Sequence, residues 1–83
     1  MNETETNKLK QMALDAMIKA IDDAMKEAKE KEEHARQWIE QDAKSGTLNA
    51  GEIVNRGQDI KEAQIAQMAL REAYSYMCLY LNA

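Results

Sequence analysis

The stretch Lys44-Ser45-Gly46-Thr47-Leu48-Asn49-Ala50 decides the fold of this 83-residue chain, because it holds a helix stop and a helix start in close succession. Gly46 can take the left-handed conformation that closes a helix. Thr47 or Asn49 can then cap a second helix, and Glu52 occupies the capping-box position three residues after Asn49. A connection this short predicts that the two helices fold back as an antiparallel hairpin.

Apolar residues recur at three- and four-residue steps on both sides of this turn, which is typical of amphipathic helices. The chain has no proline and three glycines, so little interrupts either pattern. We expect an all-α single domain over 1–83, with a flexible N-terminus over 1–6, a helix over 7–43, a turn over 44–49 and a helix over 50–81. Whether the first helix breaks within the charged stretch 26–34 stays open.

A fold-back centred near residue 47 or 48 predicts the register of the hairpin, because facing residues should have numbers that sum to about 95 or 96. Trp38 would then lie opposite Gly57, and a close approach of the indole would explain a glycine inside a helix. The middle of the hairpin is expected to pack poorly, since polar or small residues meet there: Lys31 and Ala28 against Gln64 and Gln67.

The second helix carries more apolar residues than one partner helix can cover. One stripe faces the first helix, and a second stripe is left without a partner in the hairpin. Self-association into a helical bundle would bury that second stripe, because homo-oligomers with closed symmetry are the common outcome. We therefore expect a homo-oligomer with this interface: Ile65, Met68, Ala69, Tyr76, Leu79 and Tyr80.

Composition and charge exclude several classes of function. The formal net charge of −4 argues against binding to duplex nucleic acid or to an anionic membrane, both of which need a basic surface. The N-terminal residues are acidic and polar, unlike a signal peptide, so a cytoplasmic location is expected. One cysteine, Cys78, and one histidine, His34, make neither an intrachain disulfide nor a standard zinc motif. We expect no metal, no cofactor and no catalytic residues, because no nucleophile has a base within reach.

Two sets of side chains are candidates for binding. Tyrosines and cations near the C-terminus either pack an oligomer interface or line a ligand pocket there, with rings stacking on a base and cations meeting phosphate: Lys61, Arg71, Tyr74, Tyr76 and Tyr80. Acidic side chains of the first helix either form a solvated face or dock a basic partner protein: Asp15, Asp22, Asp23, Glu27 and Glu30.

One stretch of the second helix resembles a known family. Lys61-Glu62-Ala63-Gln64-Ile65-Ala66, continuing through Leu70-Arg71-Glu72-Ala73 to Tyr76, is similar to the closing helix of the phage anti-CBASS cyclic-nucleotide sponges. The resemblance covers some 20 residues of the chain. It implies a small, non-catalytic helical oligomer that sequesters cyclic nucleotides in pockets between protomers.

These observations predict a protein that acts by binding and not by catalysis. The first hypothesis is a self-assembling binding protein that engages a partner protein, as a phage or bacterial accessory inhibitor or chaperone does. The second is a sponge for cyclic oligonucleotide signals, as the resemblance implies. The third is a purely structural assembly module.

Overall fold

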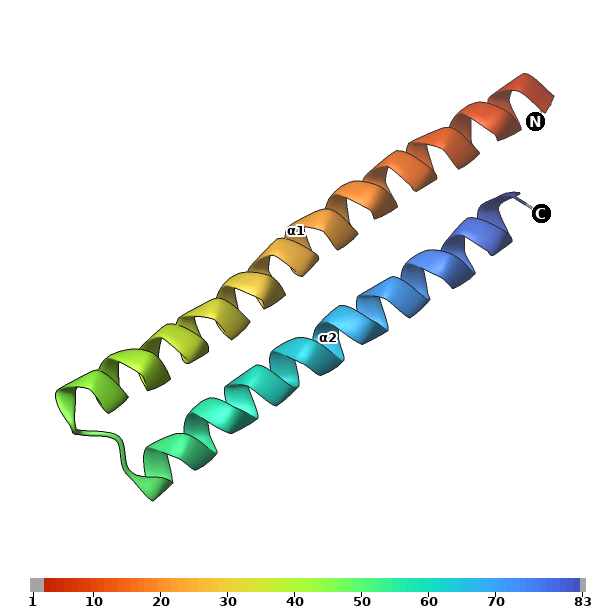
Figure 1. Cartoon of the computed structure of the whole chain (residues 1–83). Helices are drawn as coiled ribbons and strands as arrows, with labels where there is room; N and C mark the ends of the chain where they lie inside the picture. Colours follow the sequence, from red (N-terminus) through yellow and green to blue (C-terminus); the bar gives the residue numbers. More distant parts are fainter. Residues whose placement is uncertain (1–2, 83) are drawn as a thin grey trace.

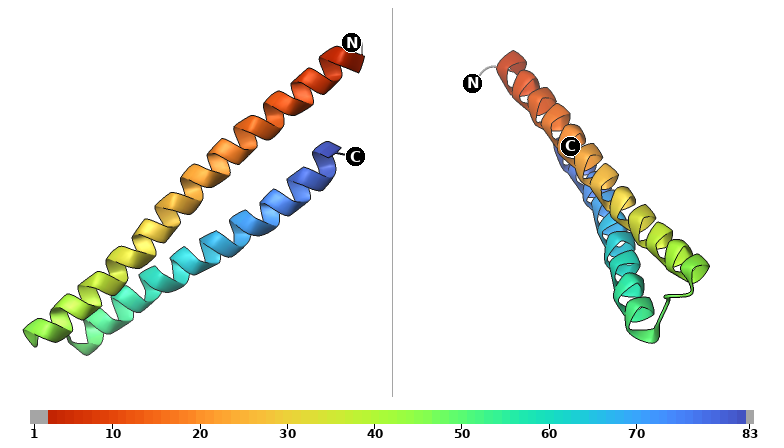
Figure 2. Two further views of the ribbon diagram at one scale, coloured as in Figure 1. Left: turned by 45° about the horizontal axis from the view of Figure 1, so that its top comes forward. Right: turned by 90° about the vertical axis from the view of Figure 1, so that its left-hand side faces the viewer.

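The computed structural model describes residues 3–82 and consists of two antiparallel helices, α1 (Glu3–Ser45) and α2 (Ala50–Asn82). The helices run side by side from the turn, and the two chain ends lie at the same end of the molecule (Figures 1 and 2). The all-α hairpin expected from the sequence is confirmed. Its extents of 66 × 15 × 12 Å describe a rod that is one helix pair thick.

Helix α1 begins earlier than expected and does not break. Residues 3–6, which were expected to belong to a flexible N-terminus, are helical, with Glu3 and Glu5 in the first turn, where acidic side chains favour a helix. Residues 1 and 2 lie outside the described part. The charged stretch 26–34 stays helical, because side chains of both signs alternate along it and its one apolar residue, Ala28, is buried.

The turn closes α1 with a Schellman motif. Gly46 has a φ of 73°, and its N–H donates to the carbonyl of Ala43 at 3.2 Å. The N–H of Thr47 donates to the carbonyl of Asp42 at 2.9 Å. These two bonds are the pair that satisfies the last carbonyls of a helix, and they require the left-handed conformation that glycine adopts without steric cost.

Asn49 caps α2. Its side-chain oxygen accepts a hydrogen bond from the N–H of Glu52 at 2.9 Å, and its carbonyl accepts the first helical bond, from the N–H of Ile53 at 3.0 Å. Thr47, the other candidate, instead donates its hydroxyl to the carbonyl of Asp42 at 3.4 Å. The amide side chain of Asn49 therefore sets where the second helix starts.

The contact between the helices has the expected register. Lys31 pairs with Glu62, Arg56 lies over Trp38, and Gln64 bonds to Glu32; the residue numbers in each pair sum to within two of 95. The expected approach of Trp38 to Gly57 is wrong, because Arg56 takes the place beneath the indole. A Cβ built on Gly57 would meet nothing within 4 Å, so the hairpin itself does not explain this glycine.

The middle of the hairpin is its best-buried part, contrary to the expectation of poor packing. Among the described residues, those that are buried are Ala28, Ala35, Ala63 and Gln67. Alanine lets two helix backbones approach closely, and the amide of Gln67 has a hydrogen-bond partner on α1. No large side chain is fully buried within the described part of the chain. The hairpin is thus held by a narrow seam of small residues.

The alanine seam predicts that enlarging a seam residue destabilises the fold. Ala63 is 1% exposed, and Ala63→Leu should lower the free energy of unfolding by about 1–3 kcal/mol because the helices must separate to admit the larger side chain. Ala16→Leu, at an exposed position of α1, is the matched control and should change it little. Urea unfolding followed by circular dichroism measures both. Equal midpoints for the two variants would contradict close packing at Ala63.

Candidate functional site

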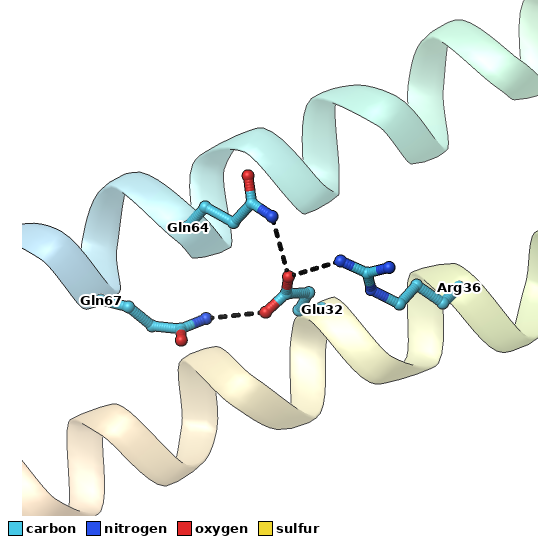
Figure 3. A network of polar contacts seen from close by, with 4 residues as sticks. All are labelled: Glu32, Arg36, Gln64 and Gln67. Atoms are coloured by element: carbon cyan, nitrogen blue, oxygen red, sulfur yellow. Dashed lines mark hydrogen bonds and ion pairs between the residues drawn. The ribbon is translucent and has the colours of Figure 1, made fainter.

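A polar network joins the two helices at the middle of the seam (Figure 3). The carboxylate of Glu32 on α1 accepts hydrogen bonds from three side chains. Gln64 and Gln67 on α2 donate their amide nitrogens at 3.0 Å each, and Arg36 donates a guanidinium nitrogen at 2.9 Å. One carboxylate on α1 thereby holds two consecutive turns of α2.

The network lowers the pKa of Glu32 to about 2, from an ordinary value of 4.5. The largest cause is the hydrogen bond from Gln67, followed by those from Arg36 and Gln64, because each of them favours the charged carboxylate. The same contact raises the pKa of Arg36. Glu32 is therefore an ionised anchor at all ordinary pH values, and it satisfies the buried amide of Gln67.

A second polar cluster lies where the hairpin turns. Arg56 sits 5.1 Å from the centre of the Trp38 ring and close to two carboxylates, Glu52 at 3.8 Å and Asp59 at 3.7 Å. A hydrogen bond with Asp42 raises the pKa of Glu52, because two neighbouring carboxyls resist ionising together. The folded state favours the neutral form of Glu52, so the stability that this group contributes is lost as pH rises through its raised pKa. The stability that Glu32 contributes has the opposite pH dependence, because it is lost as pH falls.

The face of α2 directed away from α1 carries large exposed apolar side chains. All six residues of the expected oligomer interface are on the surface. Five of them are large and between 54% and 75% exposed: Ile65, Met68, Tyr76, Leu79 and Tyr80. The sixth, Ala69, lies at the edge of an open groove between the helices, next to Ala66 and Leu70. The packing of the hairpin does not account for this apolar face.

The structure does not gather the candidate ligand residues into one place. Arg71, Tyr74 and Ser75 of α2 line a shallow pocket with three residues of α1: Ile21, Asp22 and Met25. A hydrogen bond with Cys78 raises the pKa of Tyr74. Lys61, Tyr76 and Tyr80 are exposed and do not line this pocket. A carboxylate beside Arg71 also makes the pocket a poor match for phosphate.

The acidic residues of α1 are likewise dispersed. Asp15 accepts a bond from Gln11 at 2.9 Å, and Asp23 pairs with Lys19 at 3.6 Å. Asp22 and Glu30 line a hollow that also contains Lys26 and Lys29, whereas Glu27 borders the groove between the helices. Lysines thus accompany the expected docking residues and reduce their combined negative field.

Within the described part of the chain, no three His, Cys, Asp or Glu side chains lie close enough together to hold a metal ion. His34 lines a hollow with Trp38, Arg56 and Asp59. Neither α1 nor α2 contains an apolar segment long enough to cross a bilayer.

Sequence reasoning missed the network around Glu32, because the charged stretch was interpreted as a solvent-facing surface and the glutamines as poor packing partners. One signal could have revealed it. Glu32 is four residues after Ala28 and three before Ala35, so it shares the face of α1 that contacts α2. A lone carboxylate on an otherwise small apolar stripe predicts a polar partner across the interface.

The network predicts that Glu32 controls the acid stability of the hairpin. Because its pKa is lowered in the fold, its contribution is fully present above about pH 4.5 and is lost as pH falls towards 2. Glu32→Gln should lower the urea midpoint at pH 7 and flatten its decline between pH 5 and 2. Glu33→Gln is the control, because Glu33 accepts a bond from Gln37 within α1. An unchanged midpoint for Glu32→Gln at pH 7 would refute the anchoring role.

Comparison of the chain with protein-family models, with curated proteins and with solved structures finds no match in any of the three.

Proposed function

We propose that this protein is a non-catalytic helical binding protein, which self-assembles and then engages a partner protein in the manner of an accessory inhibitor or chaperone. One observation carries the proposal. Among residues 3–82, three alanines and Gln67 are buried, while thirteen large apolar side chains are exposed. Such surface is normally covered by other protein, because burying it is the dominant favourable term in association.

The total surface supports the same conclusion. A compact monomer of 9.5 kDa exposes about 5,000 Å², whereas the hairpin exposes 6460 Å². Its radius of gyration is 19.0 Å, against about 12 Å for a compact domain of this length. Two helices cannot enclose a core by themselves, and this supports burial of the exposed apolar side chains against further protein.

The arrangement favours protein partners over a small ligand. The candidate ligand residues diverge around α2, because Arg71 and Tyr74 line a pocket that Lys61, Tyr76 and Tyr80 do not line. Exposed apolar side chains, by contrast, recur along several turns of α2, which is the form that another helix recognises.

Self-assembly predicts that the stability of the fold depends on protein concentration. The melting temperature should rise by several degrees between about 1 and 100 μM, because mass action favours the associated folded state. Sedimentation velocity should show a species heavier than 9.5 kDa over the same range. A monomer with a constant melting temperature would contradict the proposal. A closed assembly of fixed mass supports a binding protein, whereas open-ended assemblies would support a structural module.

The cyclic-nucleotide alternative has a separate test. A ligand present at 100 times its Kd adds about 2.7 kcal/mol to stability, which is easily visible in a melting curve. We expect no shift with a panel of cyclic di- and trinucleotides at 100 μM, because Arg71 and Tyr74 lie apart from Tyr76 and Tyr80. A shift of several degrees with one nucleotide, abolished by Arg71→Ala, would establish the sponge function instead.

A further inference from the structure

Eight residues of α2 follow one another along its exposed side. Seven point away from α1, and Ser75 stands at the edge, where it also lines the pocket that contains Asp22. Ala63 and Gln67 are buried against α1, so positions half a helical turn from them face outward. The eight are spaced alternately four and three residues apart, and all of them are exposed: Val54, Gln58, Lys61, Ile65, Met68, Glu72, Ser75 and Leu79. We call this set the outer stripe. Its spacing is the one by which helices pack along each other in coiled coils.

The outer stripe is complementary to itself when a second copy of α2 runs in the opposite direction. Placing Ile65 beside Met68 of the second copy also aligns every other position of the stripe. The further pairs are Val54 with Leu79, Gln58 with Ser75, and Lys61 with Glu72. Apolar residues therefore meet apolar residues, polar meet polar, and a cation meets an anion. Two-fold symmetry forms each pair twice.

Other alignments lose this match. In a parallel pair, Lys61 would face Lys61 and Glu72 would face Glu72, and like charges repel. Shifting the antiparallel pair by seven residues in either direction places Lys61 opposite an apolar residue, Leu79 or Ile65. Burying a charge without a partner is costly, so the charges select one direction and one register.

One feature of the hairpin fits this pairing. Within the described part of the chain, neither Lys61 nor Glu72 forms a salt bridge, so both charges are available to a second copy.

The area available is sufficient for a stable dimer. A standard interface buries about 800 Å² on each partner. The hairpin exposes 6460 Å², about 1,400 Å² more than a compact monomer of its mass. The outer stripe extends from Val54 to Leu79, about 38 Å along the helix at 1.5 Å per residue. An interface along this length would remove most of the excess surface.

We propose that two copies of this chain pair through the outer stripes of α2, antiparallel, with Ile65 beside Met68 at the centre and Lys61 of each copy beside Glu72 of the other. The pairing rests on the self-assembly in the proposed function and specifies its geometry. Of the expected interface residues, Ile65, Met68 and Leu79 lie in the stripe, and Ala69, Tyr76 and Tyr80 flank it on one side.

A zero-length crosslink tests the register directly. Within one chain, Lys61 and Glu72 are about 16 Å apart along the same helix, so a carbodiimide cannot join them. In the proposed dimer they are neighbours, and carbodiimide treatment of the wild-type protein followed by mass spectrometry should yield a Lys61–Glu72 link in the crosslinked dimer band. Intermolecular links at other positions without this one would overturn the register.

Charge-reversal variants at Lys61 and Glu72 give a second test of the pairing. Both residues are exposed, so these substitutions should leave the hairpin folded. Lys61→Glu or Glu72→Lys alone should raise the dimer Kd about tenfold, because two attractive pairs become repulsive. The double variant should recover the wild-type Kd. Wild-type and double-variant chains, when mixed, should sort into separate homodimers in the antiparallel pair, whereas a parallel pair would form heterodimers and refute the proposal.

The two proposals fail in different ways. A wild-type chain that remains monomeric at 100 μM overturns self-assembly, and the dimer geometry falls with it. A wild-type chain that assembles with an unchanged Kd for both single variants overturns the geometry and leaves self-assembly intact. Arg71→Glu, next to the stripe but on the flank of α2 that borders Asp22, is the control that should leave the Kd unchanged.

Discussion

The carboxylate of Glu32 is the contact on which the rest of the hairpin depends. It receives bonds from two amides of α2 and from Arg36, and it lies between Ala28 and Ala35 in a seam that has no large side chain to fix the alignment of the helices. Small residues pack almost equally well in neighbouring registers, so burial alone would favour one register of the two helices only weakly. The polar network fixes the register, because any slip would leave the amide of Gln67 buried without a partner.

A seam of alanines also has a consequence for function. It brings the helices close together but buries little apolar surface, and leaves the larger residues of the chain outside it. The molecule is therefore a rod whose exposed large apolar side chains lie mostly, but not only, on α2. In this respect the hairpin resembles half of a helical bundle.

Two charges of α2 lie where a partner would meet them. On the outer face of α2, Lys61 and Glu72 stand between apolar positions and form no salt bridge within the described part of the chain. Charges at such positions contribute more to choosing a partner and its direction than to affinity. Together with the exposed apolar side chains around them, they are why we propose that the chain assembles through α2.

The sequence by itself determined the two helices, the Gly46 stop, the antiparallel direction and the approximate register, because each depends on local periodicity, on capping or on the shortness of one turn. It also predicted that α2 has a second apolar face. Only the tertiary structure decided that Glu32 anchors the seam, that Arg56 and not Gly57 meets Trp38, and that the ligand and docking candidates are dispersed. These outcomes depend on the rotation of each helix about its axis and on which side chains reach across, and such distances between residues far apart in the chain are fixed only when the helices pack.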